Sequence, residues 1–297
     1  MSYMIRLKIH MIINLFPIKI HVWGGFGSQL FALALVFHLK EKFRTRKSIL
    51  IYHTSGVTKR TWDLPFNLVD TTVIVKNDFK LLNIVKKPNL FLNKLSLSRF
   101  FKFFYGLVGF YSDCNTTSKT RRIKPWVIDI RGHYSHRNIS FDTLSSILDM
   151  LQKHYGSEFK RVAYSPISAI QYRLGDLLEL KTKSFVSGKA ITNLVDQNVH
   201  LWPQKNFDLY SDSLEIASSL LPNFSLIPNE CTPHETVLRC LDYKYFIGTN
   251  SKLTIWIVLF RLLKDSNSYN FVPNILKSEL SQCIRDSHRF QNLIYYG

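Results

Sequence analysis

The sequence has few acidic residues, few cysteines and no long apolar run. It contains 4 cysteines, and none of them forms a CxxC pair or a Cys/His cluster with the spacing of zinc ligands. This scarcity argues against a zinc site and a disulfide framework, and a reducing cytosol is the simpler setting. No segment approaches the roughly 20 apolar residues of a membrane-spanning helix. We expect a cytoplasmic protein that is soluble or peripheral on the inner face of the membrane.

The deficit of acidic residues leaves the chain strongly basic. Its 39 Lys and Arg residues against 21 Asp and Glu residues give a formal net charge of +18. Nucleic acid, an anionic membrane or a phosphorylated substrate would each explain this charge, as would a generally basic, solubilising surface. The sequence has no recognition-helix, RNA-binding or zinc signature, so we expect no nucleic-acid partner. The basic and aromatic stretch from Arg99 to Tyr111 is either a core helix or a patch that contacts anionic lipid.

Short apolar runs alternate with segments of helical periodicity. Residues 18–23 are typical of a strand that ends in the glycine turn 24–27, and Ser28 is a candidate N-cap for the helix that follows. Further strands are predicted at 49–52, 126–131, 169–173, 207–210 and 243–247. This alternation favours an α/β fold with parallel sheets. We expect an N-terminal α/β domain over residues 1–163 and a C-terminal Rossmann-like domain over 164–297. The last helix of the second domain is a candidate to cross back to the first domain.

Polar residues stand where predicted strands give way to helices. In open α/β sheets, ligands bind outside the carboxyl ends of the strands, and the N–H groups of a helix start suit phosphate. Asn250, Ser251 and Thr254 follow one strand and form either an anion-binding helix start or an ordinary N-cap. Arg173 ends another strand, where its guanidinium is a candidate phosphate ligand, with a structural ion pair as the alternative.

The order and spacing of these motifs resemble glycosyltransferase family 11, the α-1,2-fucosyltransferases, over roughly residues 20–262. Five segments carry the resemblance. They are G-G-F-G-S-Q-L-F from Gly24, G-H-Y-S-H from Gly132, Q-Y-R-L-G-D from Gln171, Y-S-D-S from Tyr210, and the segment from Ile247 to Trp256. The sequence departs from the family's pattern at Ser28, Gln171, Leu174 and Ile255.

The resemblance implies a GT-B fold, in which two Rossmann-like domains face each other across a cleft. It also implies an inverting transfer of a sugar from a nucleotide-sugar donor, with GDP-fucose as the first choice, without a metal or another cofactor. The implied acceptor is a hydroxyl of a glycan or lipid-linked oligosaccharide in surface polysaccharide biosynthesis. A transferase with another nucleotide-sugar and a non-catalytic sugar-binding relative remain alternatives.

The resemblance also assigns site residues. It places Arg173 on the donor's pyrophosphate, and the matched carboxylate Asp176 either accepts a proton from the acceptor hydroxyl or holds Arg173 in place. Three histidines, His133, His136 and His234, are weaker candidates for the base. The remaining positions are assigned to substrate binding. They are Gly25, Gly27, Ser28, Gln29, Gln171, Asp212, Asn250, Ser251 and Thr254.

Overall fold

The protein divides into two compact units, Met1–Arg137 (unit 1) and Asn138–Gly297 (unit 2). The computed structural model describes residues 16–43, 46–54, 60–66, 71–76, 109–113, 123, 125–132, 134–156, 168–179, 185–264, 267–284 and 292–297. The two units divide between Arg137 and Asn138, which is earlier in the chain than the boundary expected at residue 163. Helix α6 (Phe141–Tyr155) belongs to unit 2 because it contacts α10 (Pro233–Arg239) and α11 (Lys252–Lys264).

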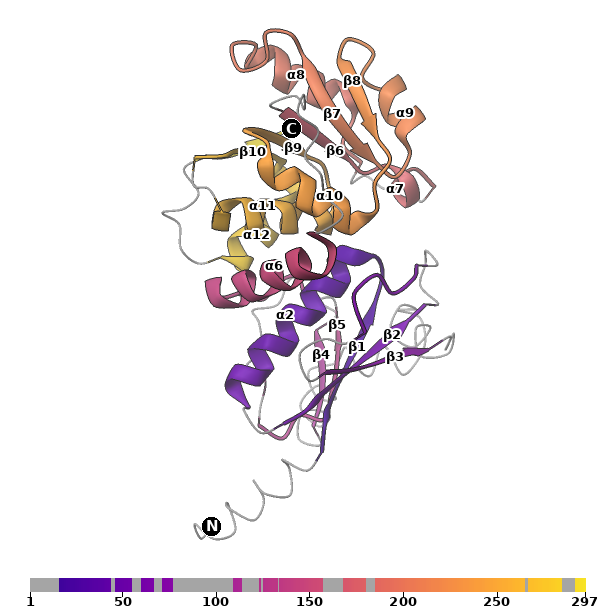
Figure 1. Ribbon diagram of the computed structural model, residues 1–297, viewed down its shortest axis with the longest axis vertical. Helices are drawn as coiled ribbons and strands as arrows, with labels where there is room; N and C mark the ends of the chain where they lie inside the picture. The colour runs from indigo at the N-terminus through magenta and orange to yellow at the C-terminus, as the bar shows by residue number, and fades with distance from the viewer. Residues whose placement is uncertain are drawn as a thin grey trace. The chain divides into compact units, whose positions relative to one another are not determined.

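The described residues of unit 1 form one parallel sheet with strand order β3-β2-β1-β5-β4 (Figure 1). Its strands are β1 (Ile18–Trp23), β2 (Ser48–His53), β3 (Thr71–Lys76), β4 (Phe110–Asp113) and β5 (Asp129–Gly132), and its helix is α2 (Phe26–Lys42). The chain turns from β1 into α2 through Gly24, whose φ of +94° lies in the region that favours glycine. The expected cap at Ser28 is wrong, because α2 begins two residues earlier and Gly25 is its N-cap.

Unit 2 holds a second parallel sheet with strand order β11-β10-β9-β6-β7-β8. Its strands are β6 (Ser168–Tyr172), β7 (Asn206–Ser211), β8 (Ser225–Asn229), β9 (Tyr245–Gly248), β10 (Tyr269–Pro273) and β11 (Leu293–Tyr296). Its further helices are α7 (Gly175–Glu179), α8 (Gly188–Gln197), α9 (Leu214–Ser219) and α12 (Lys277–Cys283), with short 3₁₀ turns at Cys240–Asp242 and Asn274–Leu276. The two parallel sheets with their helices confirm the expected α/β class with two Rossmann-like domains.

In each sheet the strand order reverses beside the first strand of the unit. In unit 2, β7 and β8 lie on one side of β6, and β9 to β11 lie on the other. In unit 1, β2 and β3 lie on one side of β1, and β5 and β4 lie on the other. Ligands of open α/β sheets bind outside the carboxyl ends of the strands at such a reversal. The topology therefore marks one candidate ligand-binding position in each unit. The cleft that the resemblance implies between the domains stays a prediction.

Helix α11 packs against α6, α10 and the 3₁₀ turn Cys240–Asp242. Every residue from Ile255 to Phe260 is 0 % exposed, so this part of the helix is buried on all of its faces. The guanidinium of the fully buried Arg261 donates to Oδ1 of Asn270 at 2.6 Å and to the carbonyl oxygen of Cys240 at 2.6 Å. Buried, charged hydrogen bonds and apolar packing fix the last turns of α11. The start of the same helix is therefore held in place as well.

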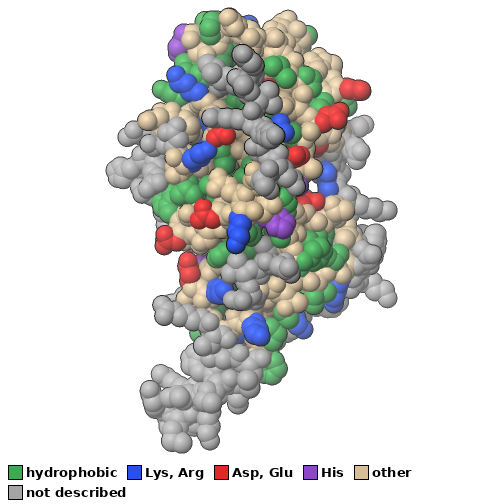
Figure 2. Space-filling view, viewed as in Figure 1, with side chains coloured by type: hydrophobic (Ala, Val, Ile, Leu, Met, Phe, Trp, Pro, Cys, Tyr) green, Lys and Arg blue, Asp and Glu red, His purple; other side chains and the backbone are tan. Residues whose placement is uncertain are grey.

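The described surface shows no concentration of charge on the face drawn in Figure 2. Its Lys and Arg side chains lie at separate places among Asp and Glu side chains. Among the described residues, no helix is long and apolar enough to cross a membrane. Residues 99–108 of the basic and aromatic stretch lie outside the described part of the chain, so its two interpretations stay predictions.

Candidate functional site

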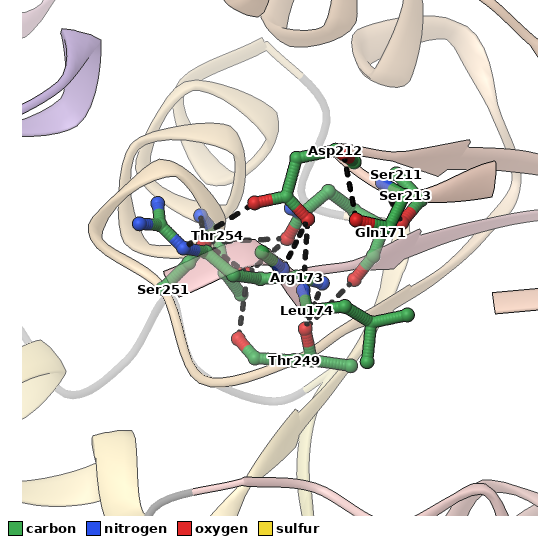
Figure 3. A network of polar contacts seen from close by, with 10 residues as sticks. Gln171, Arg173, Leu174, Ser211, Asp212, Ser213, Thr249, Ser251 and Thr254 are labelled. Carbon is green, nitrogen blue, oxygen red and sulfur yellow. Dashed lines mark hydrogen bonds and ion pairs between the residues drawn. The ribbon is translucent and has the colours of Figure 1, made fainter. Parts of the chain in front are cut away.

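Two loops of unit 2 meet at the reversal between β6 and β9. One loop follows β6 and begins with Arg173, and the other follows β9 and contains Thr249. The backbone N–H of Arg173 donates to Oγ1 of Thr249 at 2.8 Å, and the N–H of Thr249 donates to the carbonyl oxygen of Gln171 at 3.1 Å. The two loops are therefore joined by hydrogen bonds at the carboxyl edge of the sheet (Figure 3).

The amide of Gln171 connects β6 to the start of α11. Its Oε1 lies 2.6 Å from the hydroxyl of Thr254 and 3.3 Å from that of Ser251, and all three residues are buried. The Oγ of Ser251 accepts the N–H of Thr254 at 3.0 Å, so Ser251 is the N-cap of α11. These hydroxyls bond within the protein and position the helix start. Their binding of phosphate oxygens stays a prediction.

A carboxylate also shapes the site: Asp212, which follows β7. Its Oδ1 accepts the backbone N–H groups of Leu174 at 2.8 Å and Gly175 at 3.1 Å, and its Oδ2 lies 3.9 Å from Nε of Arg173. A Cβ at Gly175 would collide with Oδ2 of Asp212, which explains the glycine. Asp212 therefore holds the loop that carries Arg173. The backbone of Asp176 lies in α7, and its side chain is outside the described residues.

Lys252, the first residue of α11, was missed by the sequence analysis. Burial, opposed by the carboxylate of Glu279 and reinforced by the charge of Arg173, lowers the pKa of Lys252 to about 8. A cation at a helix N-terminus also opposes the helix dipole. That unfavourable placement is the sequence signal by which Lys252 could have been found. Lys252 thus adds a positive charge at the start of α11, and the charge of Arg173 acts on it.

The expected binding residues of unit 1 lie around the start of α2. Gly25 caps the helix, and Gly27, Ser28 and Gln29 form its first turn. The fully buried amide of Gln29 is occupied, because its Nε2 donates to the carbonyl oxygen of Thr61 at 2.8 Å and its Oε1 accepts the N–H of Asp63 at 2.8 Å. This geometry makes Gln29 a support for the 61–63 loop, and substrate binding by the four residues stays a prediction.

The three weaker histidine candidates differ in their surroundings. His133 lies outside the described residues. His136 is 7 % exposed, and neither ring nitrogen has a hydrogen-bond partner in the described structure. His234 stacks on Tyr155 with ring centroids 4.0 Å apart, and its Nε2 lies 3.0 Å from Oγ1 of Thr232. None of these observations links the three histidines to Arg173.

Comparisons with known proteins give distant likenesses only. No family model matches the chain, and no curated protein matches it. Escherichia coli heptosyltransferase WaaC with ADP has 8 % identity and a TM-score of 0.39, covering 86 % of each chain. A family 9 glycosyltransferase from Veillonella parvula DSM 2008 has 8 % identity and a TM-score of 0.42, covering 95 % of this chain and 86 % of that one. These values are too low to assign a family or a function.

The chemistry of the site follows from its own groups. Arg173, whose side chain is 28 % exposed, offers planar N–H donors, and Lys252 offers a second positive charge. The first N–H groups of α11 add a partial positive charge. Among the described residues, no group of three or more His, Cys, Asp or Glu could hold a metal ion. The arrangement suits an anion with several oxygens, such as a diphosphate.

Proposed function

We propose that the protein is an inverting glycosyltransferase that uses a nucleotide-sugar donor. The observation that supports this most directly is the convergence of Arg173 and Lys252 with the start of α11 at the reversal between β6 and β9. The carboxylates of Asp212 and Glu279 offset part of this positive charge, and the oxygens of a bound nucleoside diphosphate would provide further acceptors for the N–H groups of Arg173 and of the start of α11. The same position in an open α/β sheet is where such ligands bind.

The groups at this edge would act on the leaving diphosphate. As the acceptor oxygen attacks the anomeric carbon, the bond from that carbon to the diphosphate breaks and its electron pair leaves with the diphosphate. Negative charge then grows on oxygens beside Arg173, Lys252 and the α11 N–H groups, which stabilise it without needing to reorganise. Asp212 contributes indirectly, because it fixes the backbone from which Arg173 extends.

The sugar and the acceptor are proposed from the family 11 resemblance. It favours transfer of fucose from GDP-fucose to a hydroxyl of a glycan or lipid-linked oligosaccharide in surface polysaccharide biosynthesis. It also favours catalysis without a metal. Peripheral binding to anionic membranes would bring the enzyme to a lipid-linked acceptor, and it rests on the basic composition of the chain.

Release of nucleoside diphosphate from a panel of nucleotide-sugars tests the proposal. Wild-type protein should release GDP from GDP-fucose, and Arg173→Lys should lose most of this activity. Lys189→Ala, which changes an exposed lysine of α8, is the matched control and should behave as wild type. If the protein releases a nucleoside diphosphate from another nucleotide-sugar instead, that nucleotide-sugar is the donor and the proposed reaction class is unchanged. Tight donor binding without release would instead favour the non-catalytic sugar-binding relative.

A further inference from the structure

Almost all of the net positive charge lies in unit 1, whereas the proposed nucleotide site lies in unit 2. Residues 1–137 contain 23 Lys and Arg residues against 6 Asp and Glu residues, a formal charge of +17. Residues 138–297 contain 16 against 15, a formal charge of +1. A basic surface that only kept the protein in solution would not need to be confined to one unit. This asymmetry indicates an anionic partner of unit 1 that is distinct from the diphosphate.

Three basic segments lead into the amino ends of parallel strands. Residues 1–19 contain 3 Lys and Arg residues and no acidic residue, residues 40–47 contain 5 and the single acidic residue Glu41, and residues 114–128 contain 4 and no acidic residue. They lead into β1, β2 and β5, which pair in parallel, so the amino ends of these strands lie at one edge of the sheet (Figure 1). The topology therefore brings the ends of three basic segments to the edge opposite the one where ligands of parallel sheets bind.

Hydrogen bonds between described residues join these three segments. The guanidinium of Arg46, which is 5 % exposed, donates to the carbonyl oxygen of Phe16 at 2.9 and 3.1 Å and to that of Pro125 at 2.7 Å. Nζ of Lys42 donates to the carbonyl oxygen of Ile123 at 2.9 Å. Because the acceptors of Arg46 are neutral carbonyl oxygens, its charge adds to the positive potential of this edge.

Four side chains around this junction are exposed, and we call them the amino-edge surface. They are Phe16, which is 55 % exposed, and Lys19, Lys42 and Lys47. Lys42 lies in the last turn of α2, where a cation complements the helix dipole. None of the ion pairs in the described part of the chain involves Lys19 or Lys47. Their segments lie side by side, because the N–H of Ile18 donates to the carbonyl oxygen of Lys47 at 2.9 Å.

The amino-edge surface combines cations with an apolar side chain. Phe16 ends a stretch, residues 1–16, in which 11 residues are hydrophobic, two are basic and none is acidic. Lysines are attracted to the headgroups of an anionic bilayer, and exposed apolar side chains enter the boundary between headgroups and acyl chains. Duplex nucleic acid presents phosphates without such an apolar layer. The chemistry of this surface therefore favours an anionic membrane.

We propose that the amino-edge surface docks unit 1 onto a membrane that contains anionic lipid. The inference rests on the membrane association in the proposed function and gives it a location. Lys19, Lys42 and Lys47 contact headgroup phosphates, and the ring of Phe16 enters the boundary above the acyl chains. The carboxyl edge of the same sheet, with the turn from β1 into α2, stays clear of the membrane.

Binding to vesicles of phosphatidylcholine and phosphatidylglycerol tests the lysines. The wild-type protein should sediment with these vesicles, bind vesicles of phosphatidylcholine alone far more weakly, and lose most of its binding as salt rises. The double variant Lys19→Gln, Lys47→Gln should lower the partition coefficient roughly 30-fold, because both side chains act on the same headgroups.

The matched control removes two charges from the opposite edge of the same sheet. Arg60 lies in the loop after β2, and Lys76 ends β3. Strands of six residues separate the two edges by about 20 Å, which exceeds two Debye lengths at physiological salt. The double variant Arg60→Gln, Lys76→Gln should therefore bind nearly as well as wild type.

The variant Phe16→Ser tests the apolar contact separately. It keeps the backbone carbonyl that Arg46 binds and removes no charge. It should weaken binding to the anionic vesicles about tenfold and leave the salt dependence unchanged. Unaltered vesicle binding by Phe16→Ser would overturn lipid as the partner in favour of a polyanion that has no apolar layer.

Chemical labelling of the wild-type protein covers variants that fail to fold. Acetylation by N-hydroxysuccinimide acetate, followed by mass spectrometry, reports the accessibility of each lysine. Anionic vesicles should slow the acetylation of Lys19 and Lys47 and leave that of Lys76 unchanged. Equal protection of all three lysines, or none, would contradict docking through the amino edge.

The outcomes separate the surface from the proposed function. If wild-type protein ignores anionic vesicles even at low salt, the surface and the membrane association fail together, while diphosphate release still tests the transferase. If the Lys19, Lys47 variant and its control lose equal affinity, net charge alone binds the vesicles and the surface is wrong. A loss confined to the Lys19, Lys47 variant and Phe16→Ser supports the surface.

Discussion

The lowered pKa of Lys252 predicts that nucleotide binding depends on pH in a specific way. With a pKa of about 8, the free protein carries the Lys252 ammonium in about nine-tenths of molecules near pH 7 and in about one-tenth near pH 9. A bound diphosphate favours the charged ammonium. Binding above pH 8 must therefore be accompanied by proton uptake, and the affinity for GDP should fall about tenfold from pH 7 to pH 9, or about 1.4 kcal/mol.

Isothermal titration calorimetry of GDP at both pH values measures this effect. Lys252→Met removes the titrating group, so its affinity should be lower near pH 7 and should change much less with pH. Any titration of GDP itself is common to both proteins and cancels in the comparison. Lys189→Met, at an exposed position of α8, should retain the wild-type dependence.

The free energy of unfolding provides a second measurement for the same group. Because the folded pKa of Lys252 lies below its ordinary value of 10.5, the unfolded chain binds more protons between pH 8 and 10.5. Stability should therefore rise with pH over this range more steeply in wild type than in Lys252→Met. Equal pH dependence of GDP affinity in the two proteins would refute the placement of Lys252 in the anion site.

Three further predictions concern the same unit. Arg173→Lys keeps the charge but loses the planar, two-pronged contact, so diphosphate release should slow on the order of a hundredfold; a near-wild-type rate would remove Arg173 from the mechanism. Asp212→Ala leaves two backbone N–H groups without their acceptor, so it should lower the free energy of unfolding, measured by denaturant titration, by about 1–3 kcal/mol. Asp196→Ala breaks an exposed ion pair and should lower it by less than about 1 kcal/mol. Comparable losses in both would argue against the role of Asp212. Release should also persist in EDTA, and a requirement for Mn²⁺ or Mg²⁺ that is restored by adding the ion would contradict the metal-free mechanism.

Much of the α/β fold could be predicted from local patterns. The strand predicted at 18–23 coincides with β1, because an apolar run there meets a glycine turn that stops it. The strand β8 was missed, since it contains Pro228 and is half-exposed at the edge of its sheet, so it carries no apolar run. The cap at Ser28 was misplaced because Gly25, with extended backbone, begins the helix without any side-chain bond.

The site in unit 2 could be predicted in part, because the carboxyl ends of parallel strands meet at one edge. Arg173 and the segment at the start of α11 meet there as the strand order requires. The bonds from Asp212 to the loop of Arg173 depend on β6 pairing with β7, which no local pattern reveals. In unit 1, the hydrogen bonds that join His21 to Asp129 and to His53 likewise depend on the register of three strands that are far apart in sequence.

A thermal-shift panel of nucleoside diphosphates tests whether the protein binds such a ligand through Arg173. A ligand that binds only the folded state stabilises it by about 2.7 kcal/mol at a hundredfold excess over its Kd. GDP should raise the Tm of the wild-type protein and of Lys189→Ala, UDP should not, and the shift should disappear in Arg173→Ala. A Tm that no nucleoside diphosphate changes, or a GDP shift that Arg173→Ala retains in full, would contradict this prediction.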